Sequence, residues 1–122
     1  MTVNGGQAVL ETLRAHGIDR VFGLLGGSML ELYDAIYHAG DVGYIGARDE
    51  RAAAHMADAW ARVTGRPGVC DATLGPGATN LLTALTESLN AGIPIIAMIG
   101  DCLLPRTAEE AVYEGMMAGR AL

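Results

Sequence analysis

The chain has 122 residues, enough for one domain with a hydrophobic core. Hydrophobic residues make up 51% of the sequence, and a formal net charge of −6 without any cluster of basic residues argues against a nucleic-acid-binding protein. No apolar run is long enough to span a bilayer, and the first residues lack the pattern of a signal peptide, so we expect a cytoplasmic protein that does not bind a membrane.

Helical periodicity and short apolar runs alternate along the chain. Strands are predicted over 21–25, 42–47, 69–73 and 93–99. Helices are predicted over 7–16, from Ser28 to Gly40, from Asp49 to Gly65, over 78–89 and from Thr107 to Met117. This alternation is typical of an α/β fold and predicts a single three-layer α/β/α domain over 1–122, with a mostly parallel sheet of about four strands.

Local patterns predict the helix ends and the buried faces. Ser28 and Glu31 have the spacing of a capping box at the start of a helix. One predicted buried stripe consists of Ala53, Met56, Ala57 and Trp60. The next consists of Ala78, Leu81, Leu82, Leu85 and Leu89. The near-continuous apolar character of 93–99 predicts a strand buried on both faces.

The two cysteines and three histidines carry little functional signal. Cys70 and Cys102 have no partner spacing, so both are predicted to be free thiols in packed positions. His16, His38 and His55 fall in three different predicted helices. Scattered histidines of this kind do not predict a metal site.

Strand-to-helix turns of a parallel sheet open at one edge, where α/β proteins bind ligands. In this chain they are 26–28, 48–50, 74–77 and 100–101. The second carries the carboxylate of Glu50. This residue has two interpretations: an acidic side chain that complements the helix dipole, or a group that exchanges a proton with a heteroaromatic nitrogen.

The third turn contains the sequence Gly75-Pro76-Gly77, which lacks bulky side chains. It is either a simple turn into a helix or a place where the backbone approaches a flat ring. Asn80, one turn later, is either a solvated polar residue or a side chain that reaches back to the loop of Glu50.

Motifs in these segments resemble the amino-terminal pyrimidine-binding domain of thiamine diphosphate enzymes, in particular the acetolactate synthase branch. They are the segments 22–27, 48–50, 53–65 and 75–80, in the family's order and at its spacing. The resemblance covers 4–101. It implies an incomplete version of the family's domain, because that domain usually has more strands than the four expected here.

The resemblance also implies a site. Glu50 would hydrogen-bond the pyrimidine ring of thiamine diphosphate and activate the cofactor, so that the proton on its thiazolium carbon is removed. The activated cofactor would then attack and decarboxylate a 2-keto acid. Thr73, Pro76, Gly77 and Asn80 would line or brace the pyrimidine pocket.

The resemblance further implies partners. In the family a separate domain binds the diphosphate through magnesium, and this chain lacks the Gly-Asp-Gly motif of that domain. Family active sites form between domains of two subunits. We therefore expect a diphosphate-binding domain or partner subunit, a homo-oligomer, and no activity of the chain alone. This chain would supply no metal ligand.

Three positions depart from the family's usual residues. Asp49 stands where a histidine is common, Leu25 where a proline is common, and Asp101 where a glutamine is common. These departures favour an alternative function, a non-catalytic assembly or binding module that retains the fold and pairs with another subunit. A third interpretation is a truncated piece of a longer polypeptide.

Overall fold

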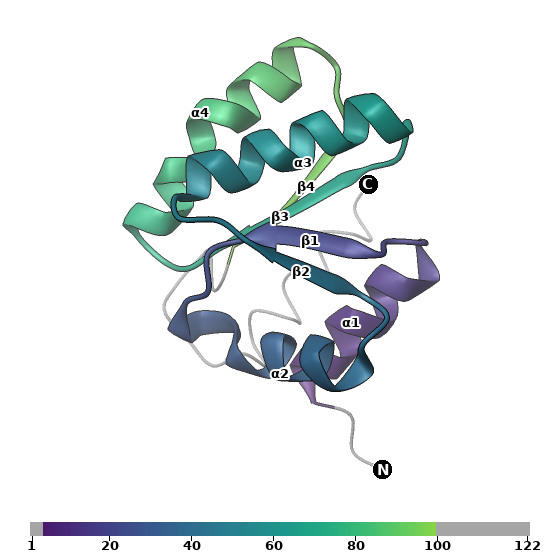
Figure 1. Ribbon diagram of the computed structural model, residues 1–122. Coiled ribbons are helices and arrows are strands. Elements are labelled where there is room, and N and C mark those ends of the chain that lie inside the picture. The colour runs from purple at the N-terminus through teal and green to yellow at the C-terminus, as the bar shows by residue number, and fades with distance from the viewer. Residues whose placement is uncertain (1–3, 100–122) are drawn as a thin grey trace, which may run out of the picture.

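Residues 4–99 are described by the computed structural model, in which helices flank both faces of a four-stranded sheet (Figure 1). The strands are β1 (Arg20–Gly23), β2 (Gly43–Gly46), β3 (Gly68–Ala72) and β4 (Ile95–Ile99). The helices are α1 (Gly5–Ala15), α2 (Leu30–Ala39), α3 (Glu50–Thr64) and α4 (Pro76–Asn90), with a short 3-10 helix η1 (Gly27–Met29) before α2. The sheet order is β2-β1-β3-β4 and all neighbours are parallel, which confirms the predicted three-layer α/β/α fold.

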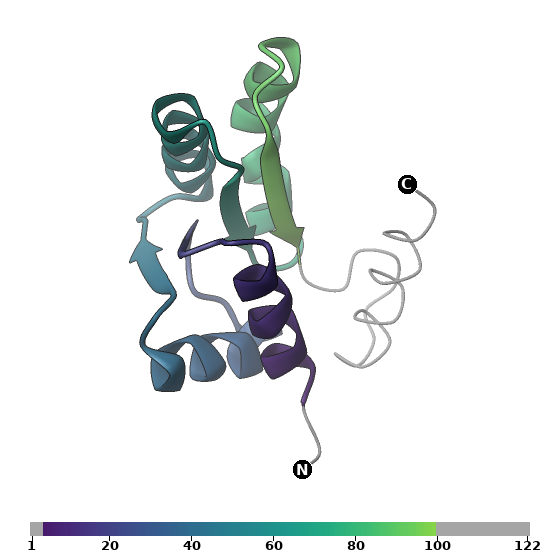
Figure 2. The same ribbon diagram turned by 90° about the vertical axis from the view of Figure 1, so that its right-hand side faces the viewer.

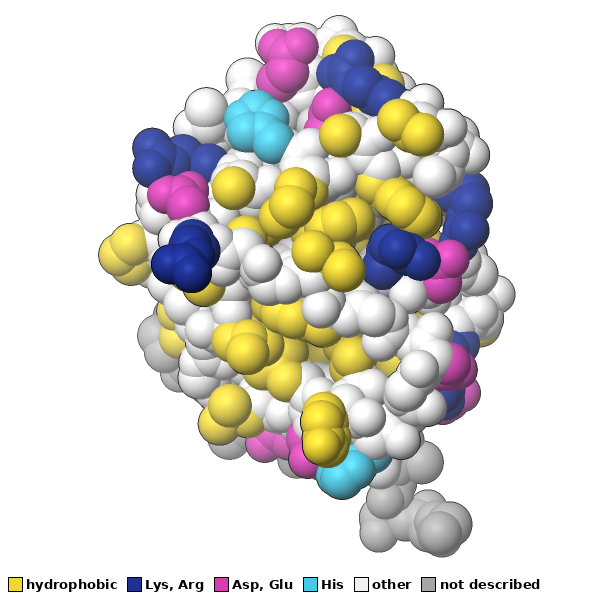
Figure 3. Space-filling model, in the orientation of Figure 1, with side chains coloured by type: hydrophobic (Ala, Val, Ile, Leu, Met, Phe, Trp, Pro, Cys, Tyr) yellow, Lys and Arg dark blue, Asp and Glu magenta, His cyan; other side chains and the backbone are white. Residues whose placement is uncertain are grey.

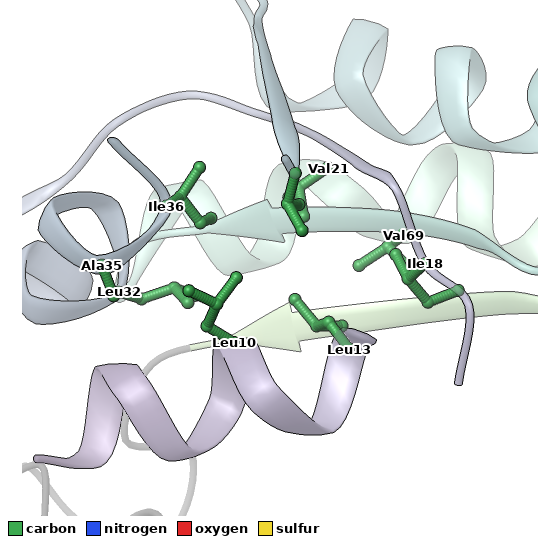
Figure 4. Packing of buried hydrophobic residues seen from close by; sticks show 9 residues of the cluster. Leu10, Leu13, Ile18, Val21, Leu32, Ala35, Ile36 and Val69 are labelled. Carbon is green, nitrogen blue, oxygen red and sulfur yellow. The ribbon is translucent and has the colours of Figure 1, made fainter. Parts of the chain in front are cut away.

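The two faces of the sheet carry separate hydrophobic cores, because side chains alternate along each strand. Val21 and Val69 pack against α1 and α2, together with leucines and isoleucines of these helices (Figure 4). Phe22 and Cys70 face the other way, toward α3 and α4. Figure 2 shows the sheet between these two pairs of helices. The predicted stripe of α3 is confirmed, since its alanines are buried and Met56 and Trp60 pack on the same core.

Capping residues end and begin the helices largely as predicted. Gly40 ends α2 and Gly65 ends α3, both in the left-handed conformation, with φ of 72° and 68°. Asp49 caps α3 by accepting a hydrogen bond from the amide of Arg51. These local signals therefore determine where α2 ends and where α3 begins and ends.

The start of α2 differs from the prediction. Ser28 lies inside η1, and α2 begins at Leu30 without a side-chain cap, so the predicted capping box of Ser28 with Glu31 is wrong. The hydroxyl of Ser28 instead lies 3.1 Å from the hydroxyl of Thr73, just after β3. A contact between distant segments has replaced the local one.

The buried face of α4 also differs from the prediction. Leu82 and Leu89 are 57% and 80% exposed, so they do not belong to the buried stripe. The buried residues of α4 are Gly77, Leu81, Ala84 and Ser88. Ser88 fits the interface with α3 because its hydroxyl donates a hydrogen bond of 2.7 Å to Asp58. That bond satisfies a polar group that would otherwise be costly to bury.

The fourth strand is less buried than predicted. Ile96 is 42% exposed and the other residues of β4 are half-buried. Within residues 4–99, β4 pairs with β3 on one side and with no strand on the other, so burial on both faces is wrong for this part of the chain. The predicted turn 100–101, the thiol of Cys102 and the helix over 107–117 lie outside the described residues. Cys70 is confirmed as a buried free thiol.

The surface of the described part carries apolar side chains beside β2. In the orientation of Figure 1, hydrophobic side chains gather across the middle of the face that β2 borders (Figure 3). Leu25, Tyr37 and Ile45 are among the exposed apolar residues. No helix within residues 4–99 has both the length and the apolar character needed to cross a bilayer.

Candidate functional site

The carboxyl ends of β1, β2 and β3 lie side by side at one edge of the sheet, as their parallel register requires. The chain leaves this edge through three turns, 26–28, 48–50 and 74–77, which together form the rim. The predicted convergence of these three turns is therefore confirmed. The fourth turn, 100–101, lies outside the described residues.

Asp49 and Glu50 point their carboxylates to different partners. Asp49 binds the guanidinium of Arg51, with Nη2 and Oδ2 2.6 Å apart. Hydrogen bonds from the side chain and the amide of Arg51 lower the pKa of Asp49 to about 2. Asp49 is thus paired with Arg51 at the surface, and among residues 4–99 Glu50 is the buried acid in these turns.

Glu50 is the first residue of α3 and is only 8% exposed. The amide of Asn80, in the second turn of α4, donates a hydrogen bond of 3.0 Å to its Oε2. This bond joins α3, which follows β2, to α4, which follows β3; these two strands lie on either side of β1. Asn80 is therefore a side chain that reaches back to Glu50, as one of its two interpretations predicts, and not a solvated polar residue.

Gly77 allows α4 to lie against this carboxylate. A methyl group at Gly77 would lie 3.1 Å from Oε1 of Glu50 and 3.0 Å from Cγ2 of Thr73. Both distances are shorter than ordinary van der Waals contact. Gly77 and Asn80 of α4 thus lie against Glu50, and Thr73, just after β3, lies beside Gly77.

Pro76 occupies the first position of α4, where the missing amide hydrogen of proline is not needed. Pro76 is exposed and precedes Gly77 in the chain. No side chain caps the start of α4, so its first amides lie at the rim without a side-chain partner. Such amides are suited to polar ligand atoms.

The Glu50 carboxylate is only partly satisfied by its surroundings. Among residues 4–99, Asn80 is the donor to Oε2, and Oε1 receives no hydrogen bond. Leaving a buried acceptor unpaired costs about 1–3 kcal/mol. A ligand with an N–H group would complete this site, and the carboxylate is placed to exchange a proton with it.

Three residues near the rim were missed by the sequence analysis. Asp71 on β3 is 0% exposed and accepts hydrogen bonds from the hydroxyls of Tyr33 and Tyr44, at 2.6 and 2.8 Å. The available signal was a carboxylate in an otherwise apolar strand. Its partners lie 38 and 27 positions away, which no local pattern reveals.

Among residues 4–99, no three histidine, cysteine, aspartate or glutamate side chains gather in a way that could hold a metal ion. The site described above therefore offers one carboxylate, one amide and small neighbours. This donor set suits an organic ligand with a polar edge.

Comparison with known proteins identifies the family to which this chain belongs. Residues 3–118 match the family model for the thiamine pyrophosphate enzyme, N-terminal TPP binding domain. The acetolactate synthase isozyme 2 large subunit of Escherichia coli (strain K12) is 43% identical over 120 residues, covering 98% of this chain and 22% of the relative. The acetolactate synthase of Arthrospira platensis is 46% identical over 109 residues, covering 87% of this chain and 18% of the relative.

A third relative has a similar identity to this chain. The probable acetolactate synthase large subunit of Methanocaldococcus jannaschii is 45% identical over 112 residues, covering 92% of this chain and 19% of the relative. The chain spans about a fifth of the length of these relatives. It belongs to the thiamine pyrophosphate (thiamine diphosphate) enzymes, and it corresponds to their N-terminal cofactor-binding domain.

Proposed function

We propose that this chain forms the pyrimidine-binding part of a thiamine diphosphate-dependent enzyme that acts on 2-keto acids, as the names of its acetolactate synthase relatives suggest. Glu50 is the catalytic residue of this part. The observation that carries the proposal is the buried carboxylate of Glu50 at the rim, with Asn80 on one oxygen and no donor on the other within residues 4–99.

The residues around Glu50 fit the pyrimidine ring of the cofactor. Among residues 4–99, Oε1 of Glu50 is a buried acceptor without a donor, and a ring nitrogen of the pyrimidine can donate to it once that nitrogen is protonated. Gly77 removes the side chain that would crowd this oxygen. Thr73 adds a compact side chain beside Gly77, so a flat ring meets little steric resistance.

Bound thiamine diphosphate supplies the nucleophilic carbon for the cleavage of a bond next to a keto group. The part of this chain is to hold and move a proton at Oε1 of Glu50, while the amide of Asn80 keeps Oε2 in place. A general acid or base in such a position contributes a factor of about 10²–10⁴ to the rate. The buried position excludes water from that proton transfer.

The remaining part of the site comes from elsewhere. We propose that a diphosphate-binding domain, in the same polypeptide or in a partner subunit, holds magnesium and the diphosphate. The short share of each relative that this chain spans supports this division. If the two parts of each active site come from two copies of the same polypeptide, the enzyme is a homo-oligomer. The isolated chain is then inactive.

The test compares Glu50→Gln with Glu87→Gln in the assembled enzyme, that is, this chain together with its diphosphate-binding domain or partner subunit. Glu87 is an exposed acid on α4, so its replacement controls for the loss of one charge. We expect Glu50→Gln to lower kcat by about 10²-fold or more, and Glu87→Gln to leave it unchanged.

The competing function is a non-catalytic assembly module. Under it, both variants would assemble with the partner and retain the partner's full activity. The departure at Asp49 favours this alternative, whereas the pairing of Asp49 with Arg51 removes the second acid from the Glu50 site and favours catalysis.

A further inference from the structure

A buried polar cluster lies on the face of β3 that packs against α1 and α2. Asp71, Tyr33 and Tyr44 form this tyrosine–aspartate cluster, in which both hydroxyls donate to the carboxylate, at 2.6 and 2.8 Å. The two tyrosine rings meet edge-on, with centroids 5.3 Å apart. The proposed function gives this cluster no role, although a buried carboxylate is costly unless it is well paired.

In this cluster the two tyrosine hydroxyls are the hydrogen-bond donors and the Asp71 carboxylate is the acceptor. Burial raises the pKa of Asp71, and the hydroxyls of Tyr33 and Tyr44 counter that rise by donating to the carboxylate. Burial also raises the pKa values of both tyrosines, so their hydroxyls keep their protons at neutral pH. The position of each hydroxyl is therefore fixed by the carboxylate between them.

The cluster touches the first turn of the rim. Besides donating to Asp71, the hydroxyl of Tyr33 accepts a long hydrogen bond of 3.4 Å from the amide of Gly26. The backbone of Gly23 lies so close to the Asp71 carboxylate that any side chain at this glycine would clash with it. Gly23, at the end of β1, therefore packs against Asp71, and the turn that follows β1 is bound to Tyr33 through the amide of Gly26.

The same turn reaches the Glu50 site through Thr73. Gly26 packs directly on the Thr73 side chain, and the hydroxyl of Ser28 lies 3.1 Å from the Thr73 hydroxyl. Thr73 in turn stands beside Gly77, whose added methyl group would meet Cγ2 of Thr73 at 3.0 Å and Glu50 at 3.1 Å. A continuous series of contacts therefore joins the tyrosine–aspartate cluster to the catalytic carboxylate.

We propose that Tyr33 is a positioning residue: with its hydroxyl held by Asp71, it fixes the turn 26–28 against Thr73 and so sets one wall of the cofactor site. The last step of this inference rests on the proposed function. The fixing of the turn does not, since it concerns contacts within this chain alone.

Tyr33→Phe and Tyr44→Phe are a matched pair for the test. Each removes one hydroxyl that donates to Asp71, and only Tyr33 also binds the amide of Gly26. Hydrogen exchange of peptides covering 22–30 is measured by mass spectrometry in the assembled enzyme without cofactor. We expect exchange on the order of threefold to fivefold faster in Tyr33→Phe than in Tyr44→Phe, the effect of losing one modest hydrogen bond. Equal exchange in the two variants overturns the proposal.

Cofactor titration of the same variants tests the link to the site. We expect Tyr33→Phe to raise the apparent Kd for thiamine diphosphate on the order of threefold to fivefold, with kcat at saturating cofactor nearly unchanged. Tyr44→Phe is expected to change neither. An unchanged Kd in Tyr33→Phe overturns the assignment of a wall of the cofactor site.

Failure of the proposed function is distinguishable from failure of this inference. If Glu50→Gln keeps full activity while Tyr33→Phe still loosens the turn 26–28, the catalytic role falls and the positioning role stands. If Tyr33→Phe does not fold, Asp71→Asn takes its place, because it weakens the hold on the same hydroxyl. Exchange in Asp71→Asn no faster than in Tyr44→Phe overturns the proposal.

Discussion

Replacing Gly77 with alanine tests how tightly α4 must lie against the Glu50 carboxylate. The added methyl group would lie 3.1 Å from Oε1 of Glu50 and 3.0 Å from Cγ2 of Thr73. Since ordinary contacts of an added methyl carbon lie at 3.4–4 Å, both side chains must move by a few tenths of an ångström. The hydrogen bond from Asn80 to Glu50, now 3.0 Å, must adjust as well.

The expected cost falls on activity more than on stability. A displacement of about 1 Å costs on the order of 10²-fold in rate, so a few tenths of an ångström should cost roughly threefold to tenfold in kcat/KM. Overpacking destabilises by about 1–3 kcal/mol, and alanine in a helix recovers up to about 1 kcal/mol relative to glycine. The free energy of unfolding should therefore change by about 2 kcal/mol or less.

Gly43→Ala is the matched control for Gly77→Ala. Gly43 lies at the opposite end of β2 from the rim, and an added methyl group there would meet its nearest atoms at 3.7 Å, an ordinary contact. The assays are kcat/KM of the assembled enzyme and urea denaturation of each variant. An activity of Gly77→Ala equal to that of Gly43→Ala would refute the argument that α4 is packed onto the catalytic carboxylate.

Three further predictions concern stability and reactivity. Ser88→Ala removes the buried hydrogen bond to Asp58 and should lower the free energy of unfolding by about 1–2 kcal/mol in urea denaturation; an unchanged midpoint would contradict the role given to that bond. Because the folded pKa of Asp71 is raised above its usual 3.8, the folded state binds more protons there, and stability should fall as the pH rises from about 4 through the folded pKa. Asp71→Asn should reduce this pH dependence of the free energy of unfolding. An unaltered dependence in this variant would contradict the role given to Asp71. Burial raises the pKa of the Cys70 thiol to about 12, so peptide mapping should find Cys70 alkylated at pH 8 only after denaturant is added.

Much of the fold could be predicted from the sequence because its signals are local. Left-handed glycines at Gly40 and Gly65 and the cap at Asp49 act within one turn of the chain, and the structure has them where the sequence predicts them. The order β2-β1-β3-β4 is not local, and the sequence analysis did not predict it. Alternation of helices and strands restricts the pairing to parallel neighbours without choosing among their orders.

The errors in the prediction arise where contacts between distant segments override local pattern. Ser28 has the spacing of a cap, yet its hydroxyl pairs with Thr73 across the rim. In α4 an apolar stripe based on leucines alone includes the exposed Leu82 and Leu89 and omits Ser88. The buried hydroxyl of Ser88 is within hydrogen-bond distance of Asp58 in α3, and no pattern within α4 contains that contact.

One part of the candidate site could be predicted from the sequence and another part could not. The sequence analysis placed Glu50 at the start of a helix and Asn80 one turn into another, and the structure brings the two side chains to 3.0 Å. That meeting could be anticipated because parallel strands open their turns at one edge. The tyrosine–aspartate cluster could not be anticipated, since its three residues come from three elements and are far apart in the chain.

The most direct test of the central claim measures the proton that Glu50 is proposed to help remove. In the assembled enzyme with bound thiamine diphosphate and magnesium, the exchange of the thiazolium proton for deuterium is followed by NMR after acid quench. We expect Glu50→Gln to slow this exchange by about 10²-fold or more and Glu87→Gln to leave it unchanged. Exchange in Glu50→Gln as fast as in the unmodified enzyme would contradict the account.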